Sequence, residues 1–138
     1  MVDLLVNIDV DDLQRATAFY TGAFDLRIGR RFGTGGVELL GASAPIYLLV
    51  KAAGTPATPT SEQVRDYGRH WTPMHLDIVV QDIDVALARA VAAGATLEKP
   101  VKTSNWGKLA LLADPFGNGF CLVEFLGRGY DEVASPPP

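Results

Sequence analysis

The sequence lacks a second cysteine, a long apolar run and any long block of basic residues. Cys121 is the only cysteine among 138 residues, so no disulfide can form within the chain, as is usual in a reducing compartment. No apolar run approaches the roughly 20 residues that a membrane-spanning helix needs, and the first residues show no secretion-signal pattern. The net charge of −4 makes the chain a poor match for nucleic acids and anionic membranes. We therefore expect a cytoplasmic protein that binds neither.

A weak internal repeat is the main feature that the sequence does contain. A shift of about 70 residues aligns residues 5–13 with residues 75–83, and places Ile8 on Ile78 and Asp12 on Asp82. In each copy a strand pattern leads to an aspartate that can cap a helix, and an Ala-rich helical pattern follows. The repeat predicts two similar modules, with a ligand cleft where the modules face each other.

Each half of the chain is predicted to have the order β-α-β-β-β. The expected strands and helix of the first half lie at residues 2–10, 13–24 (helix), 26–32, 37–40 and 46–51. Those of the second half lie at residues 74–80, 84–93 (helix), 95–101, 108–113 and 120–125. We expect one α+β domain with a first module at about 1–52, a linker at about 53–70, a second module at about 71–127 and a C-terminal tail at 128–138.

The linker is rich in Pro, Gly and Thr, so most of it is expected to be irregular. One or two helical turns are expected within residues 61–67. The segment is long enough to cover a cleft, and it could equally be a plain surface connector.

Three segments resemble the glyoxalase, bleomycin-resistance and extradiol-dioxygenase superfamily, whose fold is known as vicinal oxygen chelate. They are residues 10–20, residues 75–95 and the turn with its following residue at 114–120. Together they extend over most of residues 4–126 in the family's order. The resemblance implies that the two β-α-β-β-β modules form a cupped mixed sheet or open barrel. It implies no single function, because one fold hosts many activities.

The resemblance also implies four metal-ligand positions, one on the first and one on the last strand of each module. This chain carries Leu5, Tyr47, His75 and Cys121 there. Only His75 matches the family's ligands, Leu5 has no donor atom, and the family's metal-binding members carry a carboxylate at the position of Cys121. About three protein ligands are needed for a divalent ion with open positions, so we expect no metal cofactor. The alternative is a divalent metal at a rebuilt site of His75, Asp77 and Cys121.

The same positions define the candidate ligand-binding residues. These are Leu5, Asn7, Tyr47, His75, Asp77 and Cys121 in the cavity, with Trp71 and Trp106 at its rim. His75 and Asp77 are the candidate catalytic bases. The alternative is that His75, Asn7 and Asp77 only form hydrogen bonds within the protein. Cys121 could likewise be a small buried apolar residue, and each tryptophan a lid or interface contact.

Taken together, these patterns predict a homodimer that binds a small, mostly apolar and partly aromatic molecule without the family's metal. The alternative is a lyase, isomerase or oxygenase-like enzyme. Such an enzyme would use either a rebuilt metal site or, without metal, His75 as a general base. Arg27, Arg30 and Arg31 could attract an anionic ligand, or form a solvated surface.

Overall fold

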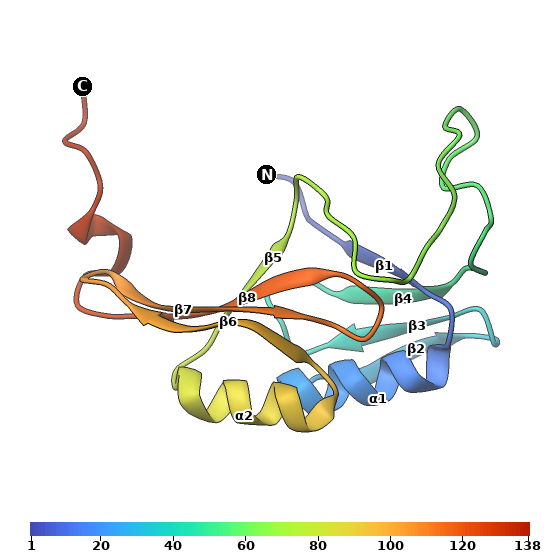
Figure 1. Ribbon diagram of the computed structural model, residues 1–138, viewed down its shortest axis with the longest axis horizontal. Helices are drawn as coiled ribbons and strands as arrows, with labels where there is room; N and C mark the ends of the chain where they lie inside the picture. Colours follow the sequence, from blue (N-terminus) through green and yellow to red (C-terminus); the bar gives the residue numbers. More distant parts are fainter.

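The computed structural model describes residues 1–138 and contains two helices and two four-stranded sheets (Figure 1). The first module consists of β1 (Val6–Val10), α1 (Leu13–Phe24), β2 (Arg27–Phe32), β3 (Gly36–Leu40) and β4 (Ile46–Val50). The second consists of β5 (Leu76–Val79), α2 (Ile83–Ala93), β6 (Thr96–Thr103), β7 (Gly107–Ala113) and β8 (Gly119–Phe125). A short 3₁₀ helix, Gly129–Glu132, follows. The predicted order β-α-β-β-β is therefore confirmed in both modules.

The two sheets have the same topology. Their strand orders are β1-β4-β3-β2 and β5-β8-β7-β6. In each sheet the first strand pairs in parallel with the last, and the other pairs are antiparallel. The sheets do not join into a closed barrel, which leaves the open, mixed α+β arrangement that the sequence predicted. Neither α1 nor α2 combines the length and apolar character that crossing a membrane requires.

The two helices begin in the same way, as the repeat predicted. The Asp12 carboxylate accepts a hydrogen bond from the backbone N–H of Arg15 at 3.0 Å, and the Asp82 carboxylate accepts from Asp84 at 3.1 Å and Val85 at 3.2 Å. These bonds satisfy N–H groups that have no partner within a first helical turn. The cap residues also share one backbone conformation, with φ of −137° in both.

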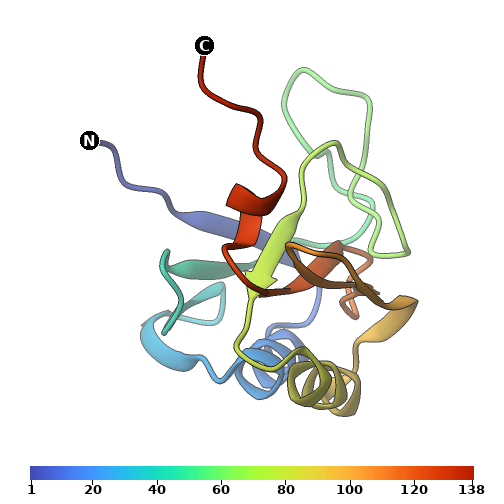
Figure 2. The ribbon, with the colours of Figure 1, turned by 90° about the vertical axis from the view of Figure 1, so that its left-hand side faces the viewer.

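The helices lie side by side beneath the sheets (Figure 1), and one hydrophobic core runs through both modules. Leu48 and Leu122 are fully buried on the sheet faces that cover the helices. Because side chains alternate along a strand, their neighbours point to the opposite faces. Both chain ends lie on that opposite side as well (Figure 1, Figure 2).

The linker forms an irregular hairpin instead of the helical turns expected within residues 61–67, so that prediction was wrong. The backbone N–H of Arg65 bonds to the carbonyl of Thr55 at 2.8 Å, and Pro56 and Val64 form an isolated antiparallel bridge. The Arg65 side chain ties the hairpin to β1 through an ion pair with Asp9 at 2.8 Å. Residues 61–67 contain no proline, but the Arg65 N–H and carbonyl are paired with Thr55 and Gly54 across the hairpin and are not available for the bonds of a helix.

Candidate functional site

The register of the sheets places equivalent residues of the two modules on equivalent faces. Asn7 lies opposite Tyr47 across β1 and β4, and Asp77 lies opposite Cys121 across β5 and β8. Tyr47 and Cys121, the two residues that the resemblance places on the last strands of the modules, thus occupy equivalent positions in the two sheets. We use the term site face for the sheet face opposite the helices, which carries Asn7, Tyr47, Asp77 and Cys121, with His75 directly before β5.

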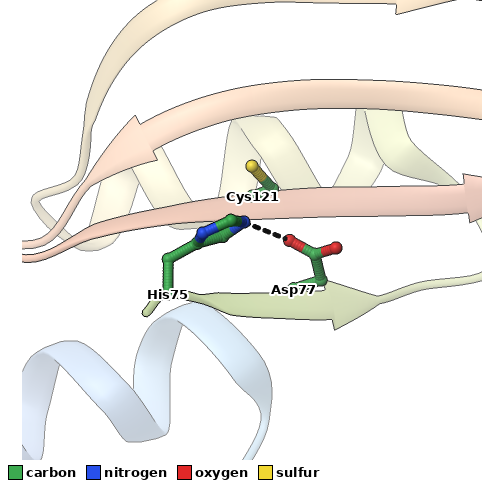
Figure 3. A group of neighbouring side chains, drawn as sticks. All are labelled: His75, Asp77 and Cys121. Atoms are coloured by element: carbon green, nitrogen blue, oxygen red, sulfur yellow. Dashed lines mark ion pairs between the residues drawn. The ribbon is translucent and has the colours of Figure 1, made fainter. Parts of the chain in front are cut away.

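His75, Asp77 and Cys121 form a cluster on the second module's site face (Figure 3). The His75 Nε2 and Asp77 Oδ1 atoms lie 3.1 Å apart. One donor atom from each of the three side chains falls within 4.8 Å of the others. The His75 side chain is 55% exposed and that of Asp77 38%, whereas Cys121 is buried. The cluster is therefore open to a ligand on one side and closed by β8 on the other.

The environment of Cys121 keeps its thiol protonated. Burial raises the pKa of this thiol, and the neighbouring Asp77 carboxylate raises it further by its charge and its hydrogen bond. A thiolate, not a thiol, is the nucleophile and the metal ligand. The arrangement therefore does not favour a catalytic cysteine, and a metal ion would have to displace the thiol proton to bind there.

The first module carries a different polar cluster at the equivalent place. Arg30 approaches the carboxylate of Glu38 with Nη2 2.6 Å from Oε2, and the Tyr47 hydroxyl donates to the same oxygen at 2.8 Å. The hydrogen bonds from Arg30 are the main cause that lowers the pKa of Glu38 from 4.5 to about 2. Glu38 is buried, and its charge is balanced by Arg30. The sequence patterns indicated Arg30 and Tyr47 as candidates but did not connect them with each other or with Glu38, although an assumed β3–β4 register would have placed Glu38 opposite Tyr47.

The family's four-position metal site does not fit the donors of this chain. Leu5 has no donor atom, and the Tyr47 hydroxyl is committed to Glu38. The side chains that could hold an ion are those of His75, Asp77 and Cys121, which lie close together in the second module. Its imidazole, carboxylate and sulfur donors suit a borderline-soft ion such as Zn²⁺ better than a hard one.

Of the two predicted rim residues, Trp106 lies apart from the cluster of His75, Asp77 and Cys121. The Trp106 ring packs against Tyr130, with ring centroids 5.1 Å apart, and against Phe125 at 6.2 Å. His75 precedes β5, which pairs with the start of β8, whereas Phe125 ends β8. The length of β8, about 20 Å at the usual rise of a strand, thus separates Trp106 from His75. Trp71 is 81% exposed.

Two further side chains on or near the strands have defined places. Leu5 precedes β1 and is 60% exposed. Glu124 points to the helix side, because it lies three residues after Cys121 on a strand whose side chains alternate, and its Oε1 accepts a hydrogen bond from the backbone N–H of Ile83 at 2.8 Å. Glu124 therefore supports the start of α2 and is not available to the cluster on the site face.

The sequence matches the model of a known family. A family model of the glyoxalase-like domain matches residues 5–123, and the chain therefore belongs to the glyoxalase-like family. This confirms the resemblance to the vicinal oxygen chelate superfamily.

Individual relatives differ in how much of their length this chain matches. An uncharacterized protein of Mycobacterium tuberculosis is 31% identical over 117 residues, which cover 82% of this chain and 68% of that protein. The anthracycline biosynthesis protein DauV of a Streptomyces species is 32% identical over 135 residues, which cover 94% of this chain but 43% of that protein. This chain thus spans less than half of the length of DauV.

A solved structure shows the same fold at low sequence identity. It is a variant of the fosfomycin resistance protein FosX from Listeria monocytogenes, in complex with Mn(II) and 1S,2S-dihydroxypropylphosphonic acid. The similarity has a TM-score of 0.71 at 19% identity and covers 97% of this chain and 100% of that chain.

Proposed function

We propose that this protein binds a small, partly aromatic molecule on its site face, in the cytoplasm, without the metal ion of the family's enzymes. The observation that carries the proposal is the pair of polar clusters at equivalent places in the two modules. One cluster offers the exposed His75 and Asp77, and the other offers Tyr47 and Arg30. Two of the four positions that would chelate a metal are occupied instead by Leu5 and by Tyr47, whose hydroxyl is already bonded to Glu38.

One relative, DauV, supports a small aromatic ligand as the first class to test. DauV is named for anthracycline biosynthesis, and anthracyclines are planar, fused-ring aromatic molecules. Phe32 is 47% exposed and packs against the Tyr47 ring with centroids 6.2 Å apart. The Arg30 guanidinium carbon lies 5.9 Å from the Phe32 ring centroid. This arrangement offers a planar ligand stacking and cation–π contacts.

We further propose that the protein is a homodimer. The segments leading into β1 and β5 expose large apolar side chains, and β1 and β5 are edge strands that are each paired on one side only. The exposed residues are Leu4, Leu5, Trp71 and Met74 in these segments and Leu76 at the start of β5. Apolar patches and open sheet edges of this kind are commonly covered by another chain.

Native mass spectrometry of the untagged protein, with and without Zn²⁺, Ni²⁺, Mn²⁺ and Fe²⁺, tests the proposal first. We expect a dimer that retains no stoichiometric metal. Stoichiometric retention of one of these ions would contradict the metal-free part of the proposal, and a monomeric mass at micromolar concentration would contradict the dimer.

Binding on the site face is tested with daunorubicin as a probe, followed by quenching of tryptophan fluorescence. Asp77→Asn and His75→Ala are expected to weaken binding by about tenfold, because each removes a polar contact. His70→Ala is the matched control, because His70 is the only other histidine and makes no side-chain hydrogen bond to this cluster. Equal affinity in all four proteins would contradict the placement of the ligand.

A second candidate function is that of an enzyme, and the 3.1 Å pair of His75 and Asp77 is the observation that favours it. A carboxylate next to an imidazole fixes the orientation of the ring, and a positioned imidazole can act as a general base. A bell-shaped pH profile of turnover that is lost in His75→Ala would favour the metal-free enzyme. Turnover that requires an added divalent ion and is lost in Cys121→Ala would favour a rebuilt metal site.

A further inference from the structure

An apolar groove lies between the modules, next to the helices and apart from the cluster of His75, Asp77 and Cys121. It has a volume of about 390 Å³, and ten of its fourteen lining residues are hydrophobic. Phe24 lines it from the end of α1, Ala42 from the β3–β4 turn, Ile78 from β5, and Val85 and Arg89 from α2. This volume is within the range of small-molecule pockets, which are mostly apolar.

The repeat shows what fills the equivalent place in the other half of the molecule. The β7–β8 turn corresponds to the β3–β4 turn, because Leu112 pairs with Phe120 as Leu39 pairs with Ile46. Phe116 lies in the β7–β8 turn, and its ring is fully buried at the junction between the modules.

Neighbouring side chains hold the Phe116 ring in this place. The Arg15 guanidinium carbon lies 5.4 Å from the ring centroid, and the Tyr67 ring packs edge-on with centroids 6.5 Å apart. The β3–β4 turn, residues 41–45, has no aromatic residue. Val85, which the repeat aligns with Arg15, lines the unfilled groove and is 64% exposed. The groove is thus the counterpart of a place that a phenyl ring occupies.

The charged groups of the groove already have partners. Arg89 donates from Nε to the carbonyl of Gly22 at 2.7 Å and forms an ion pair with Asp25 at 3.2 Å. The Asp82 carboxylate accepts the N–H groups that begin α2. A ligand of either charge would have to compete with these contacts, whereas an uncharged ring would displace only water from apolar surface.

We propose that this groove is a second binding site, specific for uncharged aromatic compounds of one or two rings. The ligand takes the place that Phe116 occupies in the other half, packs against Phe24 and Ile78, and covers Val85. The site is independent of the ligand proposed for the site face, because the residues that define the two sites differ.

Indole is a suitable probe, and ¹H–¹⁵N and methyl NMR spectra locate where it binds. Saturable chemical-shift changes are expected at Ala42, Ile78 and Val85, without comparable changes at Asn7 or Cys121. Changes confined to Asn7, Asp77 and Cys121, or changes that do not saturate, would overturn the proposal. Neither result depends on whether daunorubicin binds the site face, so the two proposals fail separately.

Two variants make the test specific. Ala42→Phe supplies a ring from the exposed β3–β4 turn and should abolish saturable indole binding. Val85→Gln should weaken binding, whereas Val91→Gln, at another exposed valine of α2, should leave it unchanged. Unchanged binding in both Ala42→Phe and Val85→Gln would overturn the proposal.

Sedimentation velocity identifies a competing occupant of the groove. If the groove is a ligand site, Ala42→Phe keeps the oligomeric state of the wild type. If Ala42→Phe and Val85→Gln dissociate a wild-type dimer while Val91→Gln does not, the groove is covered by a second copy of the chain. That result would overturn the proposal of a ligand site.

Discussion

The hydroxyl of Tyr20 donates a hydrogen bond to the carboxylate of Asp114, which lies 94 positions further along the chain and in the other module. Both residues are buried. Asp114 also accepts hydrogen bonds from the backbone N–H groups of Phe116 at 2.8 Å and Asn118 at 2.9 Å. A single carboxylate thus organises the β7–β8 turn and ties that turn to α1. Burial, followed by the charge of Asp114, raises the pKa of Tyr20 well above its ordinary value, so the hydroxyl remains a donor.

Tyr20→Phe is therefore expected to destabilise the protein. The substitution keeps the ring but removes a hydrogen bond to a charged group, which typically contributes about 1.5–3 kcal/mol. The loss in the free energy of unfolding is measured by urea denaturation, with one common slope of free energy against urea concentration used for all variants. Tyr130→Phe is the matched control, because Tyr130 is 52% exposed and should change stability by less than about 0.5 kcal/mol. Equal effects of the two substitutions would show that the Tyr20–Asp114 bond does not stabilise the fold.

Glu38 makes a specific contribution to stability in acid. Its pKa falls from 4.5 to about 2 in the folded protein, mainly through hydrogen bonds from Arg30. Between these values the unfolded chain binds a proton at this residue and the folded chain does not. The stabilisation is therefore fully present above about pH 4.5 and is lost as the pH falls towards 2.

We expect Glu38→Gln to be less stable than the wild type at pH 7 and to lose less stability between pH 4.5 and pH 2. Thermal unfolding followed by circular dichroism over this range checks both expectations. Glu62→Gln, at an exposed linker carboxylate, serves as the control. Parallel pH profiles for the wild type and Glu38→Gln would contradict the assignment.

Particular residues show how far the sequence determined the fold and the site. The caps at Asp12 and Asp82 and the equivalence of Tyr47 and Cys121 followed from local patterns and from the repeat. The Arg30–Glu38 pair could not be predicted in this way, because the β2–β3 register shifts between Ile28 and Arg31. A regular two-residue alternation cannot locate such a bulge.

The position of Trp106 shows a second reason for failure. Its partner Tyr130 lies in the 3₁₀ helix of a segment that the sequence indicated only as a tail. Packing between segments that are distant in the chain leaves no local pattern in either segment. Trp106 could therefore be recognised as a loop aromatic residue, but not placed at the end of β8.

Cys121 provides a chemical test of the cluster on the site face. Burial and the Asp77 carboxylate both raise the pKa of the thiol, so wild-type Cys121 should react with iodoacetamide more slowly than free cysteine at the same pH. Asp77→Asn removes the charge and should increase the rate several-fold, while burial keeps it below that of free cysteine. Asp131→Asn, at an exposed carboxylate, should have no effect. An unchanged rate in Asp77→Asn would indicate that the carboxylate does not act on the thiol.

The linker hairpin depends on Arg65, whose guanidinium bonds to Asp9 at 2.8 Å, to the Thr55 hydroxyl at 3.2 Å and to the Pro56 carbonyl at 2.6 Å. The Arg65 side chain is only 18% exposed, so these bonds are partly shielded from water and should exceed the contribution of a surface ion pair. Arg65→Gln is expected to release the hairpin and to speed cleavage within residues 54–65 by thermolysin several-fold, with little change in global stability. Arg27→Gln, at an exposed arginine of β2, is the control. If both variants are cleaved at the wild-type rate, the hairpin is held by its backbone hydrogen bonds alone.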